Sequence, residues 1–300
     1  MNLRHAAKLG CIVAWLGALG VCGTAVAQSR SESFQQADAH GRAESFRIAE
    51  ERHAAGDAEG VYGAAERARG VGEPVSVADL RSKLLDVDQV LLEFLVGREA
   101  TLLVLVSQDR CRSARIPVGA DSLATLAGAL RERIRAGERV PDAAIVLHEL
   151  LIEPLVREIP PEARLVLVVD APIDRVPFAV LHDGRTFLVE RHPLSSTPSA
   201  TALREAQPGG EIVALPLGDT APSVDATLPL DVALQRAQRA AIESGKAPRE
   251  WSPWVATGRM RSPRRRGGEF PAWPVPIGMA VGGLALALAL RRVRRATGSS

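Results

Sequence analysis

The stretch LVLVVDAPIDRVPFAVL, residues 165–181, decides the fold of this chain. Five apolar residues run without interruption from Leu165 to Val169, and Asp170 ends the run. A strand that is apolar on both faces is typical of the centre of a parallel sheet, because helices cover both sides of such a sheet. The stretch therefore predicts a central strand, a turn and the start of the next buried element, in an α/β domain built of layers.

The residues on either side complete this α/β pattern. QVLLEFLVG, ATLLVLVSQ and RCRSARIPV predict three short strands in a meander, with turns at Gly97-Arg98 and Gln108–Arg110. After the central strand, RTFLVERHPLSSTPS (185–199) and GEIVALPL (210–217) predict two more short strands. The sequence therefore contains enough strands for the sheet of an α/β domain.

Three helices are predicted around these strands. The first begins at Asp121 as a cap, ends at Gly137 and has a helical spacing of apolar residues at Leu123, Leu126, Leu130 and Ile134. The second covers residues 141–159 and kinks or restarts near Pro154. The third covers residues 229–245 and ends at Gly245.

The segment before the α/β region, residues 28–74, is rich in Ala, Glu and Arg and predicts a helical hairpin. Gly56-Asp57 interrupts it between two helical patterns, and Glu73-Pro74 ends it. A hairpin of this size cannot bury its own apolar face, so it must dock on another element.

Both ends of the chain carry apolar runs that predict export and anchoring. A basic start, a short apolar centre and the ending Ala25-Val26-Ala27 predict a secretory signal over residues 1–27. A second apolar run, residues 272–290, is long enough at about 1.5 Å per residue to cross a membrane, with a buried core helix as the alternative. The predicted topology places the body outside the cytoplasm and the tail, 291–300, inside it, with residues 259–271 as a basic linker.

Composition excludes several functions. The 300 residues have a net charge of +2 and 4% aromatic residues, which argues against nucleic acid as a partner. No Cys/His cluster has zinc spacing and no glycine-rich loop follows a strand, so we expect neither a metal nor a cofactor. Removal of the signal leaves Cys111 as the only cysteine, which excludes an internal disulfide framework.

An ordered series of motifs resembles the CHAT family, a caspase-like domain found next to tetratricopeptide repeats. The motifs are Pro154 late in a Leu-rich helix, Asp170 at a strand end, Pro177-Phe178, Leu188-Val189-Glu190-Arg191 and Pro198-Ser199-Ala200. The likeness covers most of residues 40–258, including the meander and a closing helix with a Trp-rich end. It implies a caspase-like domain over residues 75–258 and a tetratricopeptide-like remnant over 28–74.

The catalytic motifs of active family members are missing. In those members a His, in an apolar-Thr-His-Gly pattern, and a Cys, in a Ser-Ala-Cys pattern, act as base and thiolate nucleophile for peptide hydrolysis. Residues 204–228, where both would lie, contain neither His nor Cys. The resemblance therefore implies a truncated member, and no catalytic residue is assigned.

Two functional hypotheses and one non-functional alternative follow. The first is an exported, membrane-anchored, catalytically inactive module that binds proteins or acts as a scaffold. The second is a caspase-class thiol hydrolase that uses Cys111, with Arg110 and Arg112 beside it and His148, His182 or His192 as base. The third is a decayed gene product. Asp170 and Asp174 are interpreted as turn and strand-end residues.

Loss of the strands that carry the catalytic pair leaves the predicted sheet incomplete. We expect one neighbour to lose its partner, either residues 211–217 or the strand at 165–169. A free apolar edge is a template for a strand of another chain, so self-association through this edge is predicted.

Overall fold

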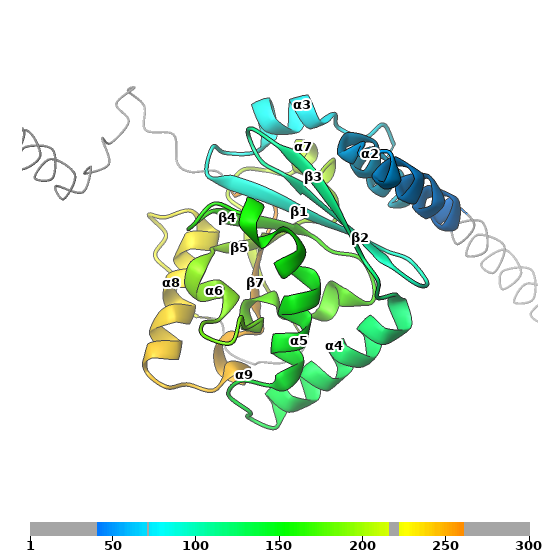
Figure 1. Cartoon of the computed structure of the whole chain (residues 1–300). Helices are drawn as coiled ribbons and strands as arrows, with labels where there is room; N and C mark the ends of the chain where they lie inside the picture. The colour runs from blue at the N-terminus through cyan, green and yellow to red at the C-terminus, as the bar shows by residue number, and fades with distance from the viewer. Residues whose placement is uncertain (1–40, 71, 216–221, 261–300) are drawn as a thin grey trace, which may run out of the picture. The chain divides into compact units, whose positions relative to one another are not determined.

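A seven-stranded mixed sheet runs through the part of the chain that the computed structural model describes, residues 41–70, 72–215 and 222–260 (Figure 1). The strand order is β3-β2-β1-β4-β5-β7-β6. The strands are β1 (Gln89–Val96), β2 (Thr101–Val106), β3 (Cys111–Ile116), β4 (Arg164–Val168), β5 (Leu194–Ser196), β6 (Glu211–Ala214) and β7 (Trp254–Thr257). The predicted α/β class is confirmed, with a sheet that is mixed.

The meander and the central strand form as predicted. β1, β2 and β3 pair antiparallel in chain order, and the turns close with hydrogen bonds from Gly97 N to Ala100 O and from Ser107 N to Arg110 O. β4 is buried along its whole length and lies parallel to both β1 and β5. The prediction that β4 could be the strand without a partner is therefore wrong.

The strand predicted over residues 185–199 forms only in part. Its first half is the short helix α6 (Leu188–Arg191), and only Leu194–Ser196 form a strand, β5. The helix begins because the Glu190 carboxylate accepts a hydrogen bond from the backbone N–H of Phe187 at 2.7 Å. This local cap outweighs the strand preference of an apolar run of three residues.

The C-terminal strand β7 was not predicted from the sequence. It lies between β5, to which it is parallel, and β6, to which it is antiparallel. β7 therefore gives β5 a second neighbour, and β6 is an edge strand of the sheet.

Helices cover both faces of the sheet (Figure 1). The α-helices, besides a helix over residues 41–54, are α2 (Ala58–Ala68), α3 (Val77–Asp79), α4 (Ala120–Arg135), α5 (Asp142–Leu151), α6, α7 (Ala202–Glu205), α8 (Leu230–Glu243) and α9 (Pro248–Trp251). The other helical segments are a π-helical turn, Leu80–Leu84, and the 3-10 segments Glu153–Glu158, Ile173–Arg175 and Phe178–Val180.

Two large hydrophobic clusters lie on opposite faces of the sheet. On β1, Leu92 and Phe94 belong to the cluster beneath α4, α5 and α6, whereas Leu91 and Leu95 belong to the cluster beneath α2 and α3. Alternate residues of a strand point to opposite faces, so the continuous apolar run of β1 is buried on both sides. This arrangement is a sheet between two layers of helices.

The boundaries of the three helices that the sequence predicted agree with the structure, except at one N-cap. α4 begins at Ala120 with Gly119 as its N-cap, so Asp121 lies in the first turn and is not the predicted cap. An acidic side chain in the first turn still stabilises a helix, through the helix dipole. Gly137 and Gly245 follow their helices with φ of 83° and 76°, in the left-handed region that favours glycine. The restart at Pro154 is confirmed as a 3-10 segment after α5.

The predicted N-terminal helical hairpin is confirmed over the described residues 41–70. Gly56 has a φ of 73° between the two helices, and Asp57 caps α2 by accepting a hydrogen bond from Gly60 N at 2.8 Å. The buried residues Val61 and Ala65 place α2 on the sheet as part of the second hydrophobic cluster.

Other sequence predictions fall on residues that the structure does not describe. These are the signal at 1–27, the span at 272–290, the tail at 291–300 and most of the basic linker at 259–271. None of the helices formed by the described residues has the length and apolar character needed to cross a membrane. Arg259 and Met260 belong to the fold, because the carbonyl of Met260 accepts hydrogen bonds from Gln89 Nε2 and Arg164 Nη2, each at 2.9 Å.

Candidate functional site

Cys111 begins the edge strand β3 and packs against the hydrophobic cluster that lies beneath α2. Burial raises the pKa of its thiol to about 11, and the negative charge of Glu59 raises it further, whereas Arg81 and Arg112 lower it. A thiol with a raised pKa is rarely present as the nucleophilic thiolate at neutral pH.

The three histidines considered as a base for Cys111 lie elsewhere. His148 is on α5, which covers the other face of the sheet, and His182 and His192 stand on either side of α6. His182 Nδ1 accepts a hydrogen bond from Gly184 N at 3.0 Å, and His192 Nδ1 lies 2.9 Å from the carbonyl of Ala163. Burial lowers the pKa of both His148 and His192. The fold therefore does not bring these histidines to Cys111.

We expect Cys111 to react slowly with iodoacetamide in the native protein. A pKa of about 11 in place of 9 lowers the thiolate fraction at pH 8 about a hundredfold, and the half-buried position adds a steric barrier. Mass spectrometry of the full-length chain, native and in urea, measures both rates. Native labelling as fast as labelling in urea would contradict this prediction and favour the hydrolase.

Asp170, which the sequence indicated as a turn residue, also contacts residues that are distant in the chain. It is 5% exposed, its Oδ2 accepts a hydrogen bond from Val96 N at 3.2 Å, and it forms ion pairs with Arg42 and with Arg69, the latter at 3.9 Å. An acidic residue directly after a buried parallel strand was the signal that could have indicated this role. Asp174, by contrast, lies in a 3-10 turn at the wall of a cavity.

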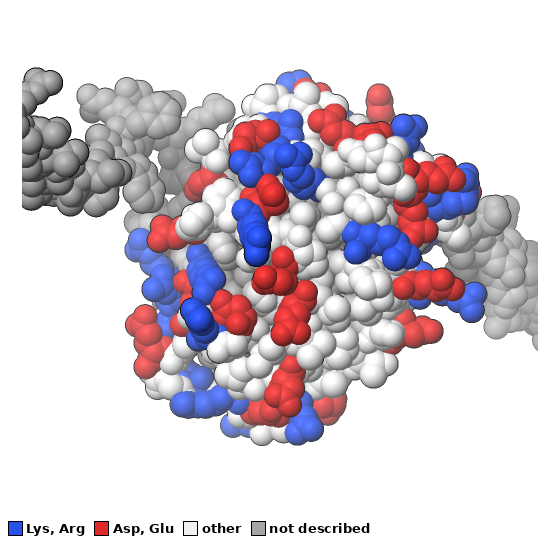
Figure 2. Space-filling view, in the orientation of Figure 1, with Lys and Arg blue, Asp and Glu red and all other residues white. Residues whose placement is uncertain are grey.

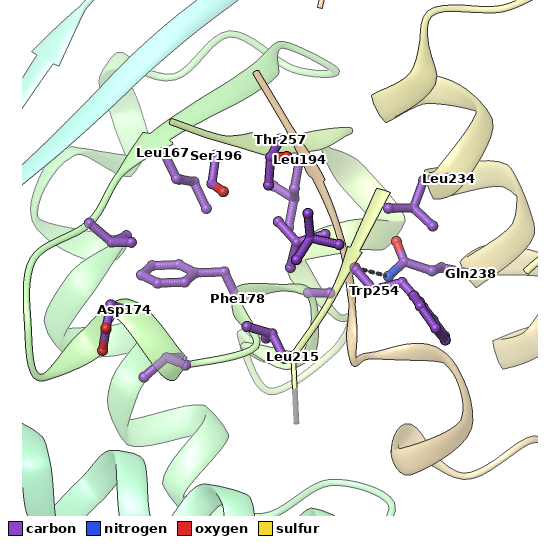
Figure 3. Close-up of a pocket in the computed structure, with 15 residues that line it drawn as sticks. Leu167, Asp174, Phe178, Leu194, Ser196, Leu215, Leu234, Gln238, Trp254 and Thr257 are labelled. Atoms are coloured by element: carbon purple, nitrogen blue, oxygen red, sulfur yellow. Dashed lines mark hydrogen bonds between the residues drawn. The ribbon is translucent and has the colours of Figure 1, made fainter. Parts of the chain in front are cut away.

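A cavity of about 90 Å³ lies between the sheet, the 3-10 segments at 173–180 and helix α8 (Figure 3). It is lined by Leu167, Val169, Asp174, Val176, Phe178, Ala179, Leu194, Ser196, Val213, Leu215, Leu234, Gln238, Trp254, Val255 and Thr257. Few of these side chains are polar, and the amide of Gln238 is engaged by the carbonyl oxygens of Trp251 and Trp254 at 2.9 and 3.2 Å. The lining contains no Cys, His or Lys. A mostly apolar lining suits the binding of an apolar group.

One wall of this cavity is formed by Val213 of the edge strand β6 and by Leu215, the residue after it. Leu215 N donates to Pro253 O at 2.7 Å, and Gly209 N donates to Arg259 O at 3.1 Å. Since antiparallel strands bond through alternate residues, the odd-numbered residues face β7, and Ile212 and Ala214 direct their N–H and C=O groups to the free edge.

The two edges of the sheet differ in charge. The outer strand β3 carries Arg112 and Arg115, and Arg115 pairs with Glu50 at 2.9 Å. Charged side chains on an edge strand discourage the addition of another strand. β6 has one charged residue, Glu211 at its start, while Val213 is 40% exposed. Among the described residues, the β6 edge therefore combines backbone groups that no described strand pairs with and an exposed apolar side chain beside a cavity.

The described residues hold no group of three or more His, Cys, Asp or Glu side chains that could bind a metal ion. The candidate site is therefore the β6 edge together with its apolar cavity.

Comparison with known families agrees with the central part of this fold. Residues 142–221 match the CHAT domain. The CHAT match begins with α5, contains the stretch 165–181 and extends past β6, so it includes most of the cavity wall. The meander and the closing helix, where the sequence also resembles CHAT, lie outside the matched residues. No curated protein matches the chain.

Proposed function

We propose that this protein is a non-catalytic, CHAT-like binding module that associates with other chains through the β6 edge. The observation that carries the proposal is the pairing of a strand edge that no described strand covers with a mostly apolar cavity whose lining holds neither Cys nor His. A strand added to β6 would place alternate side chains beside Val213, at the mouth of the cavity.

A second copy of the chain is the partner that this edge suits best. If Ile212 of one copy pairs antiparallel with Ala214 of the other, Ile212 and Ala214 of both copies form hydrogen bonds with their outward N–H and C=O groups. Val213 then lies opposite its own copy, while Glu211 lies opposite Leu215 and away from the other Glu211. This register is self-complementary and juxtaposes no like charges.

We expect Val213→Lys to abolish most of this self-association. The substitution puts a charge at the centre of the paired strands, where it would meet its own copy. Two full-length chains with different affinity tags, coexpressed and extracted in mild detergent, should co-purify, and the recovered partner should fall about tenfold when both carry Val213→Lys.

Val146→Lys is the matched control, because Val146 is 38% exposed on α5, against 40% for Val213 on β6. The control should leave co-purification unchanged. If both substitutions have the same effect, or if neither has any, the β6 edge is not the contact.

Export and anchoring are a separate part of the proposal. They are supported by the signal pattern at 1–27 and the apolar run at 272–290, both outside the described residues. The mixture of basic and acidic side chains on the face shown in Figure 2 supports a partner other than nucleic acid.

Alkaline phosphatase folds only outside the cytoplasm. We therefore expect a fusion of this enzyme after residue 262 to be active and a fusion after residue 300 to be inactive. Enzyme activity in intact cells, normalised to the amount of membrane-bound fusion, is the measurement. An inactive first fusion that is nevertheless made and membrane-bound contradicts the topology.

A further inference from the structure

A cluster of five ionisable side chains lies where the N-terminal helices meet the sheet. Arg42 comes from the helix at 41–54, Glu66 and Arg69 come from the region of α2, Glu93 is on β1 and Asp170 follows β4. Glu66 and Glu93 are both fully buried, and Arg69 and Asp170 are nearly so. The cluster thus joins both helices of the hairpin to two neighbouring strands.

Arg69 and Asp170 each make polar contacts with several partners. Arg69 Nε donates to Glu93 Oε1 at 3.1 Å, and Arg69 Nη2 donates to the carbonyl of Phe94 at 2.6 Å. Asp170 is held by Arg42, Arg69 and the backbone N–H of Val96.

The two oxygens of Glu66 are both engaged by backbone donors. Oε1 accepts from Ala200 N at 2.9 Å and Oε2 accepts from Thr201 N at 2.8 Å. Glu66 is therefore the member of the buried acidic pair whose two oxygens both have hydrogen-bond partners.

The second oxygen of Glu93 has no such support. Glu93 Oε2 is buried and, among the described groups, has no hydrogen-bond partner. The cluster also contains three carboxyl groups, Glu66, Glu93 and Asp170, against two guanidinium groups, Arg42 and Arg69. A negative charge on Glu93 would leave a buried excess charge on an unpaired oxygen, which is costly.

We propose that Glu93 is a proton-binding site, protonated at neutral pH, and that this proton keeps the N-terminal helices docked on the sheet. When the helices separate from the sheet, Glu93 meets water and releases the proton to it. Alkaline conditions therefore loosen the docking.

The surroundings of Glu93 support this assignment. Burial raises its pKa well above the ordinary range, the charge of Glu66 raises it further, and Arg69 lowers it by less. Tyr62, also on α2, has its pKa raised by burial and by the charges of Glu66, Glu93 and Cys111, so it adds no negative charge at neutral pH.

The direction of the pH dependence follows from this shift. Because the docked state holds the proton more tightly than the undocked state, docking is strongest below the pKa of a solvated glutamate. It weakens as the pH rises towards the pKa of the docked state. Between these two values the opening equilibrium rises about tenfold per pH unit.

Hydrogen–deuterium exchange of the full-length chain in mild detergent tests this proposal. The measured quantity is the ratio of the exchange rate of the α2 amides to that of the α8 amides, and this ratio cancels the intrinsic pH dependence of exchange. Between pH 6 and pH 8 the ratio should rise in the native sequence. In Glu93→Gln, which mimics the protonated acid, the ratio should stay level. Glu149→Gln, an exposed change on α5, should leave the native slope intact.

Infrared spectroscopy of the native sequence provides a test that does not depend on the variant folding. A protonated carboxylic acid at pH 7 has a carbonyl band that carboxylates lack, and this band should be present in the native chain and Glu149→Gln and absent in Glu93→Gln. Absence of the band in the native chain, or an unchanged exchange slope in a folded Glu93→Gln, overturns the proposal.

Discussion

Replacing Asp231 with alanine is expected to lower the free energy of unfolding by about 3–5 kcal/mol. Asp231 is fully buried at the start of α8 and binds Arg164 of β4 with both oxygens, at 2.8 Å to Nε and 3.1 Å to Nη2. Arg164 is 3% exposed, so the substitution leaves a buried guanidinium with less compensation. Its other carboxylate partners, Asp86 and Asp88, are more exposed and more distant, at 3.3 and 3.4 Å.

Urea unfolding of the full-length chain in mild detergent, followed by circular dichroism, measures this loss. Arg135→Ala is the control, because Arg135 pairs with Glu132 on the exposed side of α4. An exposed ion pair contributes at most about 1 kcal/mol, so the control should remain close to the native value. If Asp231→Ala loses no more than the control, the buried pair does not anchor α8 to the sheet.

Replacing Glu66 with alanine is expected to cost about 2–5 kcal/mol. The substitution leaves the N–H groups of Ala200 and Thr201 buried without their acceptor, and each unsatisfied group costs about 1–3 kcal/mol. The missing side chain also leaves a small cavity under α2, which adds to the loss.

Glu66→Gln separates the hydrogen bonds from the packing. Its amide oxygen can accept one of the two N–H groups, while its NH2 group faces the other donor, so the loss should be smaller than in Glu66→Ala but still measurable. The same urea experiment compares both variants with the native chain. Equal stability of Glu66→Ala and the native chain would show that water replaces the carboxylate at this site.

The sequence predicted the elements whose signals are local. The meander, β4, α4, α5, α8 and the hairpin at 41–70 form where apolar periodicity and the glycine and proline breaks placed them. These features depend on which face of each segment is apolar and on which residues tolerate a turn, and both are properties of a short stretch of chain. The local signals gave wrong predictions at two helix starts, α6 and α4, where the N-cap residues are Phe187 and Gly119.

The candidate site was predicted less completely. Residues 211–217 were expected as a free edge, and β6 is at the edge, but the alternative at β4 was wrong because both of its neighbours are present. The cavity beside β6 could not be predicted, since its walls come from segments as distant as Leu167 and Trp254.

By itself, the sequence determined the α/β class, the resemblance to CHAT and the absence of His and Cys from residues 204–228, because these depend on composition and order along the chain. Tertiary structure alone decided that β7 inserts between β5 and β6, that Cys111 lies apart from His148, His182 and His192, and that Glu93 lies beside Glu66. The physical reason is that strand order, burial and the neighbours of a charge depend on contacts between residues far apart in the chain. Such contacts form only when both faces of the sheet are covered.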